Sequence, residues 1–270
     1  MDQVHVQALF DLTGKTGLVT GGARNLGFDM AMALAEAGAD VVITSRNIES
    51  ARRAALNIST ETQRKILPVA CDVRFEEQVR SALQRGLEEF GKLDILVNNA
   101  GNVESTPENA PLDVRPLEEW EKTVDVNLKG TFLFCKHAVA LAMKPAHEGS
   151  IINIGSVIGM VGKDRRSYAG TGRGGPTVDY AAAKAGVINM TRDMACYLAP
   201  WNIRVNCISP GGFHTDESTE FAHRYGEDVP LGRMGCLGKE IKGAVIFLAS
   251  EASSYVTGIN LPVDGGYTAW

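Results

Sequence analysis

The stretch Lys15-Thr16-Gly17-Leu18-Val19-Thr20-Gly21-Gly22-Ala23-Arg24-Asn25-Leu26-Gly27 decides how this chain folds. Residues 15–20 predict a buried strand, and the Ala-rich segment that follows predicts a helix to about Ala37. A Gly-rich turn between a strand and a helix N-terminus exposes backbone N–H groups and lets an anion approach closely. The stretch therefore predicts a phosphate cradle; a purely structural turn is the alternative. The candidate contacts are Gly21, Arg24, Asn25, Leu26 and Gly27.

The glycines of this turn are irregularly spaced. Gly21 and Gly27 fit the two ends of a dinucleotide-binding fingerprint, but Asn25 stands where a middle glycine is often found. Asparagine adopts left-handed φ values more readily than most residues. We therefore expect the turn to keep its shape with Asn25 in it.

The rest of the chain alternates between short apolar runs and longer segments of helical pattern. This alternation predicts an α/β protein with a doubly wound, Rossmann-type parallel sheet, helices on both faces and a single domain over 1–270. Ligands of such sheets bind at the carboxyl ends of the strands. The further predicted strands are 40–46, 66–70, 93–97, 150–154 and 203–208, the sheet ends within 258–266, and the further helices are 48–62, 75–90, 117–143, 180–199 and 239–249.

The end of the second strand indicates which dinucleotide binds. An acidic residue there would hold the adenosine ribose 2′-OH of NAD, but residues 44–47 are Thr, Ser, Arg and Asn. Arg46, together with Arg24, suits a planar, charge-assisted contact with a 2′-phosphate, and Ser45 adjoins it. We therefore predict NADP(H) in preference to NAD(H). The alternative is that both arginines are solvated surface residues.

Two further strand ends carry candidate cofactor contacts. After the third strand, Asp72 can accept a hydrogen bond from an adenine amino group, or it can cap the helix that begins near Phe75. The fourth strand is followed by Asn98-Asn99-Ala100-Gly101, whose small and amide side chains let the backbone and a cofactor come close. The predicted contacts here are Asp72, Val73, Asn99, Ala100 and Gly101.

Tyr180 and Lys184 form a candidate catalytic pair. Side chains four residues apart on a helix share one face, so the phenol and the ammonium can meet. A nearby ammonium favours phenolate and would bring the Tyr180 pKa closer to neutral. Ser156, after the predicted strand 150–154, offers a hydroxyl to a substrate oxygen. A Tyr-x-x-x-Lys pair alone also occurs by chance on many helices.

Asn127 is a candidate proton-relay residue within the predicted helix 117–143. Asn in mid-helix disfavours the helix slightly and Gly130 does so more, which predicts a local kink. Asn127 could hold a water beside Lys184. The alternative is a buried Asn whose hydrogen bonds serve structure alone.

Composition excludes several classes of function. The net charge of -5 and the lack of a long basic run argue against nucleic acid as a partner, and no apolar run is long enough to span a membrane. The N-terminus lacks a signal-peptide pattern. Five scattered cysteines predict reduced thiols in a cytoplasmic protein, and the five histidines show no metal-ligand spacing with them. We therefore expect no metal site.

Together the motifs resemble the short-chain dehydrogenase/reductase family, in its single-domain branch. The resemblance spans residues 12–268 and implies a Rossmann fold with a parallel sheet of about seven strands. It rests on Thr20-Gly21…Gly27, Asn98-Asn99-Ala100-Gly101, Asn127, Ser156, Tyr180-x-x-x-Lys184 and Pro210-Gly211.

The resemblance also implies roles for individual residues. Tyr180 would be the general acid/base and Ser156 would hold the carbonyl oxygen. Lys184 would bind the nicotinamide ribose and tune Tyr180, and Asn127 would keep the relay water. Residues 216–236 would be a mobile substrate loop, and relatives form a tetramer interface at the last strand, so we expect a homotetramer or homodimer. The nicotinamide end would be held by Pro210, Gly211, the backbone near Phe213 and the hydroxyl of Thr215.

An insertion over residues 160–178 departs from the family pattern, because it makes the distance from Ser156 to Tyr180 unusually long. Its core carries four cations and one acid, which suits a lid that attracts a substrate carboxylate or phosphate. A subunit contact or a solvated loop is the alternative. Residues 1–12 look like an N-terminal extension. The four cations are Lys163, Arg165, Arg166 and Arg173.

These observations predict an NADP(H)-dependent oxidoreductase that interconverts a secondary alcohol and a ketone. Residues 150–212 are similar to gluconate 5-dehydrogenase-like enzymes, so we expect a small, possibly acidic sugar acid or polyol as substrate. A 3-oxoacyl-thioester (acyl-carrier-protein) reductase is the alternative. A non-catalytic dinucleotide-binding protein is a more remote one.

Overall fold

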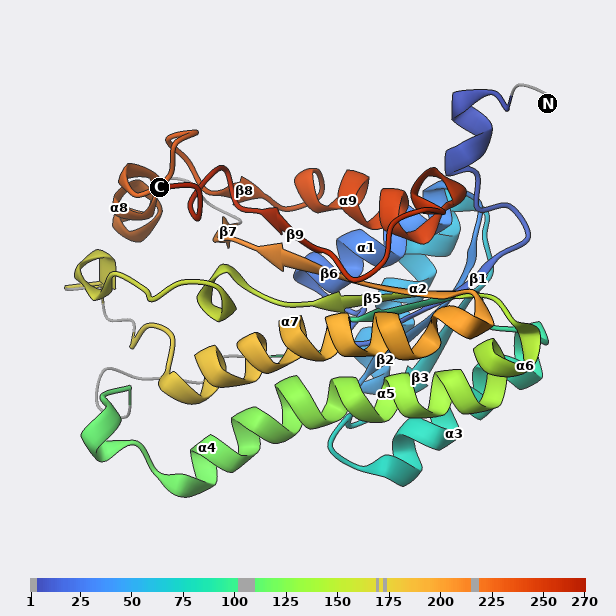
Figure 1. Cartoon of the computed structure of the whole chain (residues 1–270), viewed down its shortest axis with the longest axis horizontal. Coiled ribbons are helices and arrows are strands. Elements are labelled where there is room, and N and C mark those ends of the chain that lie inside the picture. The colour runs from blue at the N-terminus through green and yellow to red at the C-terminus, as the bar shows by residue number, and fades with distance from the viewer. Residues whose placement is uncertain (1–3, 102–109, 169, 172–173, 215–218) are drawn as a thin grey trace.

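Seven parallel strands form the centre of the protein (Figure 1). The computed structural model describes residues 4–101, 110–168, 170–171, 174–214 and 219–270. The strand order β3-β2-β1-β4-β5-β6-β9 runs outward in opposite directions from β1 and β4, so the strand order reverses between these two strands, which confirms the doubly wound sheet. The bounds are β1 Thr16–Val19, β2 Asp40–Ser45, β3 Ile66–Ala70, β4 Ile95–Asn98, β5 Gly149–Ile154, β6 Ile203–Pro210 and β9 Asn260–Val263.

Helices cover both faces of the sheet. Successive strand residues point to opposite sides, and apolar residues on both sides need a helix to bury them. Val19 and Ile43 pack against α1, α2 and α9, whereas Leu18 and Val42 pack against α3, α5 and α7. The two faces therefore carry separate apolar layers, as the unbroken apolar strands predict. The helix bounds are α1 Asn25–Glu36, α2 Ile48–Thr62, α3 Glu76–Phe90, α5 Gly130–Ala138, α7 Val178–Leu198 and α9 Glu240–Ala249.

The segment predicted as one helix over 117–143 is a series of pieces. α4 (Leu117–Val124) continues into a π-helical turn at Asp125–Lys129, and α5 continues into a second one before α6 (Lys144–Ala146). The first wide turn contains Asn127 and is followed directly by Gly130, and these are the two residues that disfavour a regular helix. The expected irregularity is therefore a local widening, which is common at functional sites.

The segment predicted as a mobile substrate loop contains regular structure. Its described part holds α8 (Glu220–Glu227) and strand β8 (Gly235–Cys236), which pairs with β7 (Phe213–His214). Thr215 lies outside the described residues, as do 216–218. The predicted N-terminal extension contains a 3₁₀ turn at Val6–Phe10. Among the described residues, no helix is both long and apolar enough to cross a membrane.

Candidate active site

A cleft of about 850 Å³ lies at the carboxyl ends of the strands, where β1 and β4 diverge. Asn127 is buried beside this cleft, and Phe213 lines a separate cavity of about 570 Å³ instead. The structure therefore brings nearly all the predicted site residues to one place. Those that line the cleft are Gly21, Arg24, Asn25, Leu26, Gly27, Ser45, Arg46, Asp72, Val73, Asn99, Ala100, Gly101, Ser156, Tyr180, Lys184, Pro210 and Gly211.

The Gly-rich turn has the backbone that a phosphate cradle requires. Gly21 has φ +64° and Asn25 has φ 49°, so Asn25 adopts the left-handed conformation expected of it. A Cβ on Gly27 would overlap the carbonyl oxygen of Gly21 and lie 2.5 Å from Asn99 Nδ2. Any larger residue at Gly27 would displace the turn. The turn therefore fits the close approach of a dinucleotide pyrophosphate at the N-terminus of α1.

Thr20 and Asn99 join the ends of β1 and β4 beneath the cradle. The Thr20 hydroxyl accepts hydrogen bonds from the backbone N–H of Asn99 at 2.9 Å and of Ala100 at 2.8 Å. In return, Asn99 Nδ2 donates to the Thr20 carbonyl at 2.8 Å. These bonds satisfy backbone groups where the strands separate, and they fix the floor of the cleft. The sequence motif contained both residues, but the role of the Thr20 hydroxyl emerged only from the structure.

Four arginines, Arg24, Arg46, Arg53 and Arg74, line the cleft, and two of them were not predicted. Arg53 lies in the second turn of α2. Its position near the start of that helix was the only sign in the sequence that it could reach the cleft. Arg74 binds the carboxylate of Asp72 with Nη2 to Oδ2 at 2.7 Å.

Asp72 is held by Arg74 rather than by the next helix. Hydrogen bonds from Arg74 hold the pKa of Asp72 below its usual range, against the effect of burial. The N-cap of α3 is Phe75, without a side-chain bond, so the alternative that Asp72 caps this helix is wrong. Asp72 nevertheless lines the cleft, so its contact with an adenine stays a prediction.

Lys184 and Tyr180 lie on the buried start of α7. Lys184 Nζ donates to the carbonyl of Ile154 at 2.7 Å and lies 5.7 Å from the centre of the Tyr180 ring. Ser156 is the second residue after β5, and its Oγ accepts a hydrogen bond from Ile158 N at 3.2 Å. Residues far apart in sequence thus meet beyond the end of β5.

The environment shifts both ionisable groups of this pair. Burial lowers the pKa of Lys184 to about 8. Burial raises the pKa of Tyr180, and a hydrogen bond with Ser156 opposes this rise only in part. The expectation that Lys184 brings the Tyr180 pKa toward neutral is therefore not met: desolvation of the phenolate is the larger effect.

Asn127 completes the group from the π-helical turn. Its side chain is fully buried, and Nδ2 donates to the Thr123 carbonyl at 3.0 Å. A Cβ on Gly101 would lie 2.5 Å from Asn127 Oδ1 and 3.4 Å from Lys184 Nζ. Gly101 therefore marks the space between these two polar groups. A relay water in this place stays a prediction.

A buried ion pair that the sequence did not reveal fixes the residue before Tyr180. Arg115 Nη2 lies 2.7 Å from Asp179 Oδ2, and the two side chains are 3% and 0% exposed. Burial raises the pKa of Asp179, but hydrogen bonds from Arg115, Thr177 and Thr123 outweigh it and hold the pKa below its ordinary value. Removing one partner of such a pair typically costs about 3–5 kcal/mol, because the other charge stays buried. The pair therefore ties the start of α7 to the segment before α4.

The insertion's cations do not all face a substrate. Lys163 has a side chain that is only 4% exposed and is turned into the protein, and Arg166 is paired with Asp164. Arg165 is exposed, and Arg173 lies outside the described residues. The interpretation of four substrate-attracting cations is therefore wrong for Lys163, because aromatic rings and Asp228 enclose its ammonium. In the part of the chain that the structure describes, no cluster of three or more His, Cys, Asp or Glu side chains could hold a metal.

Comparison with known proteins identifies the family of this chain. Residues 21–268 match the family model described as Enoyl-(Acyl carrier protein) reductase. The chain is 40% identical over 261 residues to trans-4-hydroxycyclohexanecarboxylate dehydrogenase of Sinomonas cyclohexanicum, covering 94% of this chain and 93% of that protein. It is 38% identical over 260 residues to 3-oxoacyl-[acyl-carrier-protein] reductase of Chlamydia trachomatis, covering 94% and 98%.

A solved structure agrees over the whole fold. The crystal structure of a short-chain type dehydrogenase/reductase from Mycobacterium marinum has a TM-score of 0.88 and 36% identity, covering 98% of this chain and 100% of that chain. The fold and the site thus define an oxidoreductase that acts on CH–OH groups with a nicotinamide cofactor. The chain belongs to the short-chain dehydrogenase/reductase family.

Proposed function

We propose that this protein is an NADP(H)-dependent dehydrogenase/reductase that interconverts a secondary alcohol and a ketone. Its substrate would be a small hydroxy acid, such as a sugar acid, or a polyol. The observation that carries the proposal is the meeting of Ser156, Tyr180 and Lys184 at one end of a cleft whose other end has a phosphate cradle. Asn127 lies next to Lys184 through the space at Gly101. These groups suit proton transfer to and from a carbonyl oxygen.

The chain's own residues bind, orient and move a proton. The bound nicotinamide supplies or accepts the hydride. Ser156 Oγ is placed to donate a hydrogen bond to the substrate oxygen, and the Tyr180 hydroxyl supplies or takes the proton of that oxygen. The Lys184 ammonium offsets negative charge on Tyr180 when that proton leaves. Asn127 and Lys184 border the space through which a water would return the proton.

The arginines favour the phosphorylated dinucleotide. Arg24 follows β1 and Arg46 follows β2; both are exposed and both line the cleft, and no acidic residue stands directly after β2. Arg74, although it also lines the cleft, is bound to Asp72. Two exposed guanidinium groups here suit the 2′-phosphate of NADP(H), whereas they offer the two ribose hydroxyls of NAD(H) no carboxylate acceptor.

A small carboxylate-bearing alcohol is the substrate that we favour. The relative from Sinomonas cyclohexanicum acts, by its name, on a hydroxycyclohexanecarboxylate, which combines a ring alcohol with a carboxylate. A sugar acid such as gluconate has the same two groups. Association into a homodimer or homotetramer belongs to this proposal, and size-exclusion chromatography with light scattering tests it.

A 3-oxoacyl-thioester reductase is the second candidate. The Chlamydia trachomatis relative carries that name, and the match with this chain covers 98% of that protein. This activity needs the same reacting groups but a more open substrate side. The two candidates therefore differ in the shape of the substrate side rather than in the catalytic residues.

A spectrophotometric screen separates the two candidates. NADPH and NADH are each tested with 5-ketogluconate, 4-oxocyclohexanecarboxylate and acetoacetyl thioesters, free and on acyl carrier protein. We expect NADPH oxidation with the keto acids at a kcat/KM at least about ten times that with the thioesters. Turnover of the thioesters alone would replace the first candidate with the second. No turnover of any ketone, with the dinucleotide still bound, would favour a non-catalytic binding protein.

A further inference from the structure

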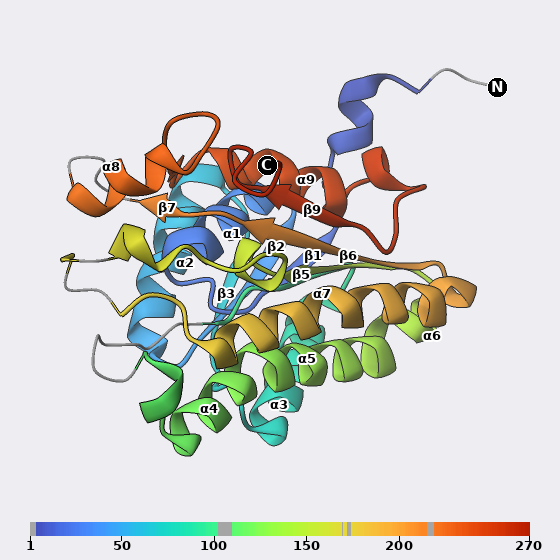
Figure 2. The same ribbon diagram turned by 60° about the vertical axis from the view of Figure 1, so that its left-hand side comes forward.

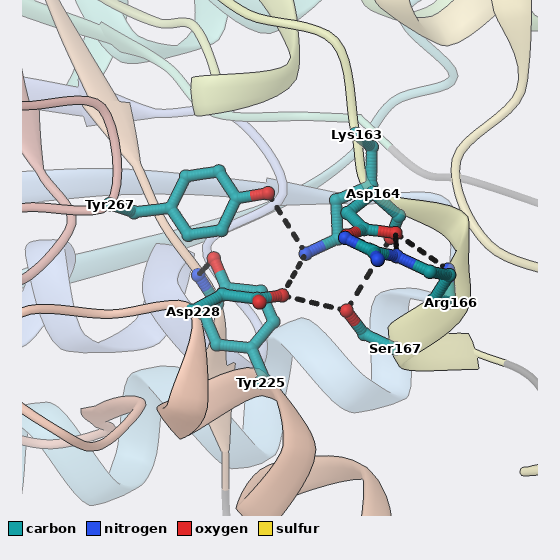
Figure 3. Close-up of polar contacts among 8 residues, drawn as sticks. Lys163, Asp164, Arg166, Ser167, Tyr225, Asp228 and Tyr267 are labelled. Atoms are coloured by element: carbon teal, nitrogen blue, oxygen red, sulfur yellow. Dashed lines mark hydrogen bonds and ion pairs between the residues drawn. The ribbon is translucent and has the colours of Figure 1, made fainter. Parts of the chain in front are cut away.

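A lysine of the insertion, Lys163, has a buried ammonium that holds the insertion against the rest of the protein. Lys163 Nζ lies 3.1 Å from the hydroxyl of Tyr267 and 3.9 Å from the carboxylate of Asp228. It also lies 4.3 Å, 4.6 Å and 5.5 Å from the ring centres of Tyr225, Tyr267 and Tyr168. Figure 3 shows the ammonium between Tyr267 and Asp228, beside Tyr225. Aromatic rings and a carboxylate together stabilise a cation that has left water.

Three polypeptide segments meet at this ammonium. Lys163 and the 3₁₀ turn Arg165–Tyr168 come from the insertion, Tyr225 and Asp228 come from α8 and its end, and Tyr267 comes from the C-terminal segment. Ser167 Oγ donates to Asp228 Oδ2 at 2.7 Å, and the Tyr168 and Phe221 rings lie 5.0 Å apart. We call this assembly of 163–168, 220–229 and Tyr267 the substrate wall.

The substrate wall is continuous with the catalytic end of the cleft. Val157, which directly follows Ser156, is buried in one apolar cluster with Phe221, Tyr225 and Tyr267. The Tyr225 hydroxyl also accepts a hydrogen bond at 2.7 Å from the backbone N–H of Gly212, next to the cleft residue Gly211. Both views of the ribbon place α8 and the insertion side by side, beyond the ends of β5 and β6 (Figures 1 and 2). A shift of the wall would therefore be felt at Ser156 and at Gly211.

We propose that Lys163 is a specificity-determining residue, because it clamps the insertion onto α8 and makes a fixed wall that favours small, free keto or hydroxy acids over acyl groups carried on a protein. This inference rests on the proposed function and names its substrate class. The positive charge of Lys163 therefore stabilises contacts within the protein. The Arg166 guanidinium also interacts electrostatically with Asp228, but in the part of the chain that the structure describes it is Lys163 whose ammonium contacts Asp228 and the rings of Tyr225 and Tyr267. The clamp therefore depends on Lys163 itself.

The test compares Lys163→Met with two other variants. Met keeps the length and the apolar stem but removes the charge, Asp228→Asn is a milder break of the same clamp, and the exposed Arg165→Gln is the matched control in the same turn. Amide hydrogen exchange is measured over α8, which is distant in sequence from Lys163. The ratio of kcat/KM for 4-oxocyclohexanecarboxylate to that for acetoacetyl-acyl carrier protein is measured in parallel.

We expect Lys163→Met to raise exchange in α8 and to lower this kcat/KM ratio by about ten-fold, with a smaller effect in Asp228→Asn and none in Arg165→Gln. The affinity for NADPH should stay unchanged in all three, because the cradle lies elsewhere. A ratio unchanged in Lys163→Met, whether or not α8 loses protection, would overturn the specificity role. Inactivity of the unaltered protein toward every ketone would instead refute the proposed function. In that case, raised α8 exchange still supports the clamp and unchanged exchange overturns it.

Discussion

The two ends of the cleft are built in different ways. The dinucleotide end consists of strand ends and turns, and its close contacts come from backbone and small residues such as Gly21, Gly27 and Ala100. Beyond the other end of the cleft, the substrate wall consists of large side chains from segments far apart, with Lys163 and Tyr267 separated by 104 residues and Ser167 and Asp228 by 61. The first end is a property of local geometry, and the second is a property of packing.

This difference predicts that the two ends can be broken separately. A change at the cradle should remove dinucleotide binding and leave the wall intact. A change at the wall should alter substrate choice and leave the dinucleotide bound. The proposed catalytic residues lie at the end of the cleft opposite the cradle, next to the substrate wall, so a change there should stop the reaction without disturbing dinucleotide binding or the wall.

The largest effect is expected for Tyr180→Phe. Loss of the phenol removes the group that carries the proton, so kcat should fall by about 10³-fold. NADPH affinity, measured by fluorescence titration, should stay within about two-fold, since the cradle has no part in this change. Tyr197→Phe, at an exposed position on the same helix, is the control and should keep full activity. Substantial activity in Tyr180→Phe would remove Tyr180 as the acid/base.

Gly27→Ala should break the dinucleotide end alone. Its Cβ would overlap the Gly21 carbonyl oxygen and crowd Asn99 Nδ2, so the turn must shift. We expect NADPH affinity to fall by about 100-fold, which corresponds to about 2.8 kcal/mol. Isothermal titration calorimetry measures this change. Gly243→Ala on α9, where an added Cβ meets no atom within 4 Å, should bind NADPH normally. Equal affinities in the two variants would contradict the cradle.

Arg46→Asp tests the dinucleotide end more finely, because it should change the preference between NADPH and NADH. A carboxylate at this position repels a 2′-phosphate and can accept hydrogen bonds from a ribose. The ratio of kcat/KM with NADPH to that with NADH should fall by at least about ten-fold. Arg52→Asp, on an exposed α2 residue that does not line the cleft, should leave the ratio unchanged. The 2′-phosphate assignment fails if both variants behave alike.

The smallest expected effect is a pH dependence set by Lys184. Burial lowers its pKa to about 8, so the ammonium is present below this pH and is lost as the pH rises through it. Ketone reduction leaves negative charge on Tyr180, so kcat/KM should fall by half near pH 8 and further above it. In Lys184→Arg, which stays charged, this decline should disappear. A decline of the same midpoint in Lys184→Arg would assign it to another group.

Much of the dinucleotide end could be predicted from the sequence. Alternating strands and helices determine a doubly wound sheet, and such a sheet collects its strand ends at one edge, so Gly21, Asn99, Ser156 and Lys184 had to lie near one another. The left-handed φ of Asn25 also followed from its residue type. Arg53 and Arg74 were missed because the direction of a long side chain on a helix or a loop depends on its neighbours.

The substrate end could not be predicted in the same way. The sequence showed an excess of positive charge in the insertion, but it did not show that the charge of Lys163 is turned inward. The Arg115–Asp179 pair was missed for the same reason, because Arg115 lies in the segment before α4 and Asp179 lies on α7, far away in the sequence. Even the Tyr180 pKa depended on burial, which the spacing of Tyr and Lys does not contain.

By itself, the sequence determined the sheet and the backbone of the Gly-rich turn, because these follow from short-range periodicity and from the conformations that glycine and asparagine allow, and it led to the proposed reacting groups. Only the tertiary structure decided where the insertion packs, which charges are buried and how the substrate side is closed. These features depend on contacts between distant segments, and desolvation in such contacts reverses the preferences that the same side chains have in water.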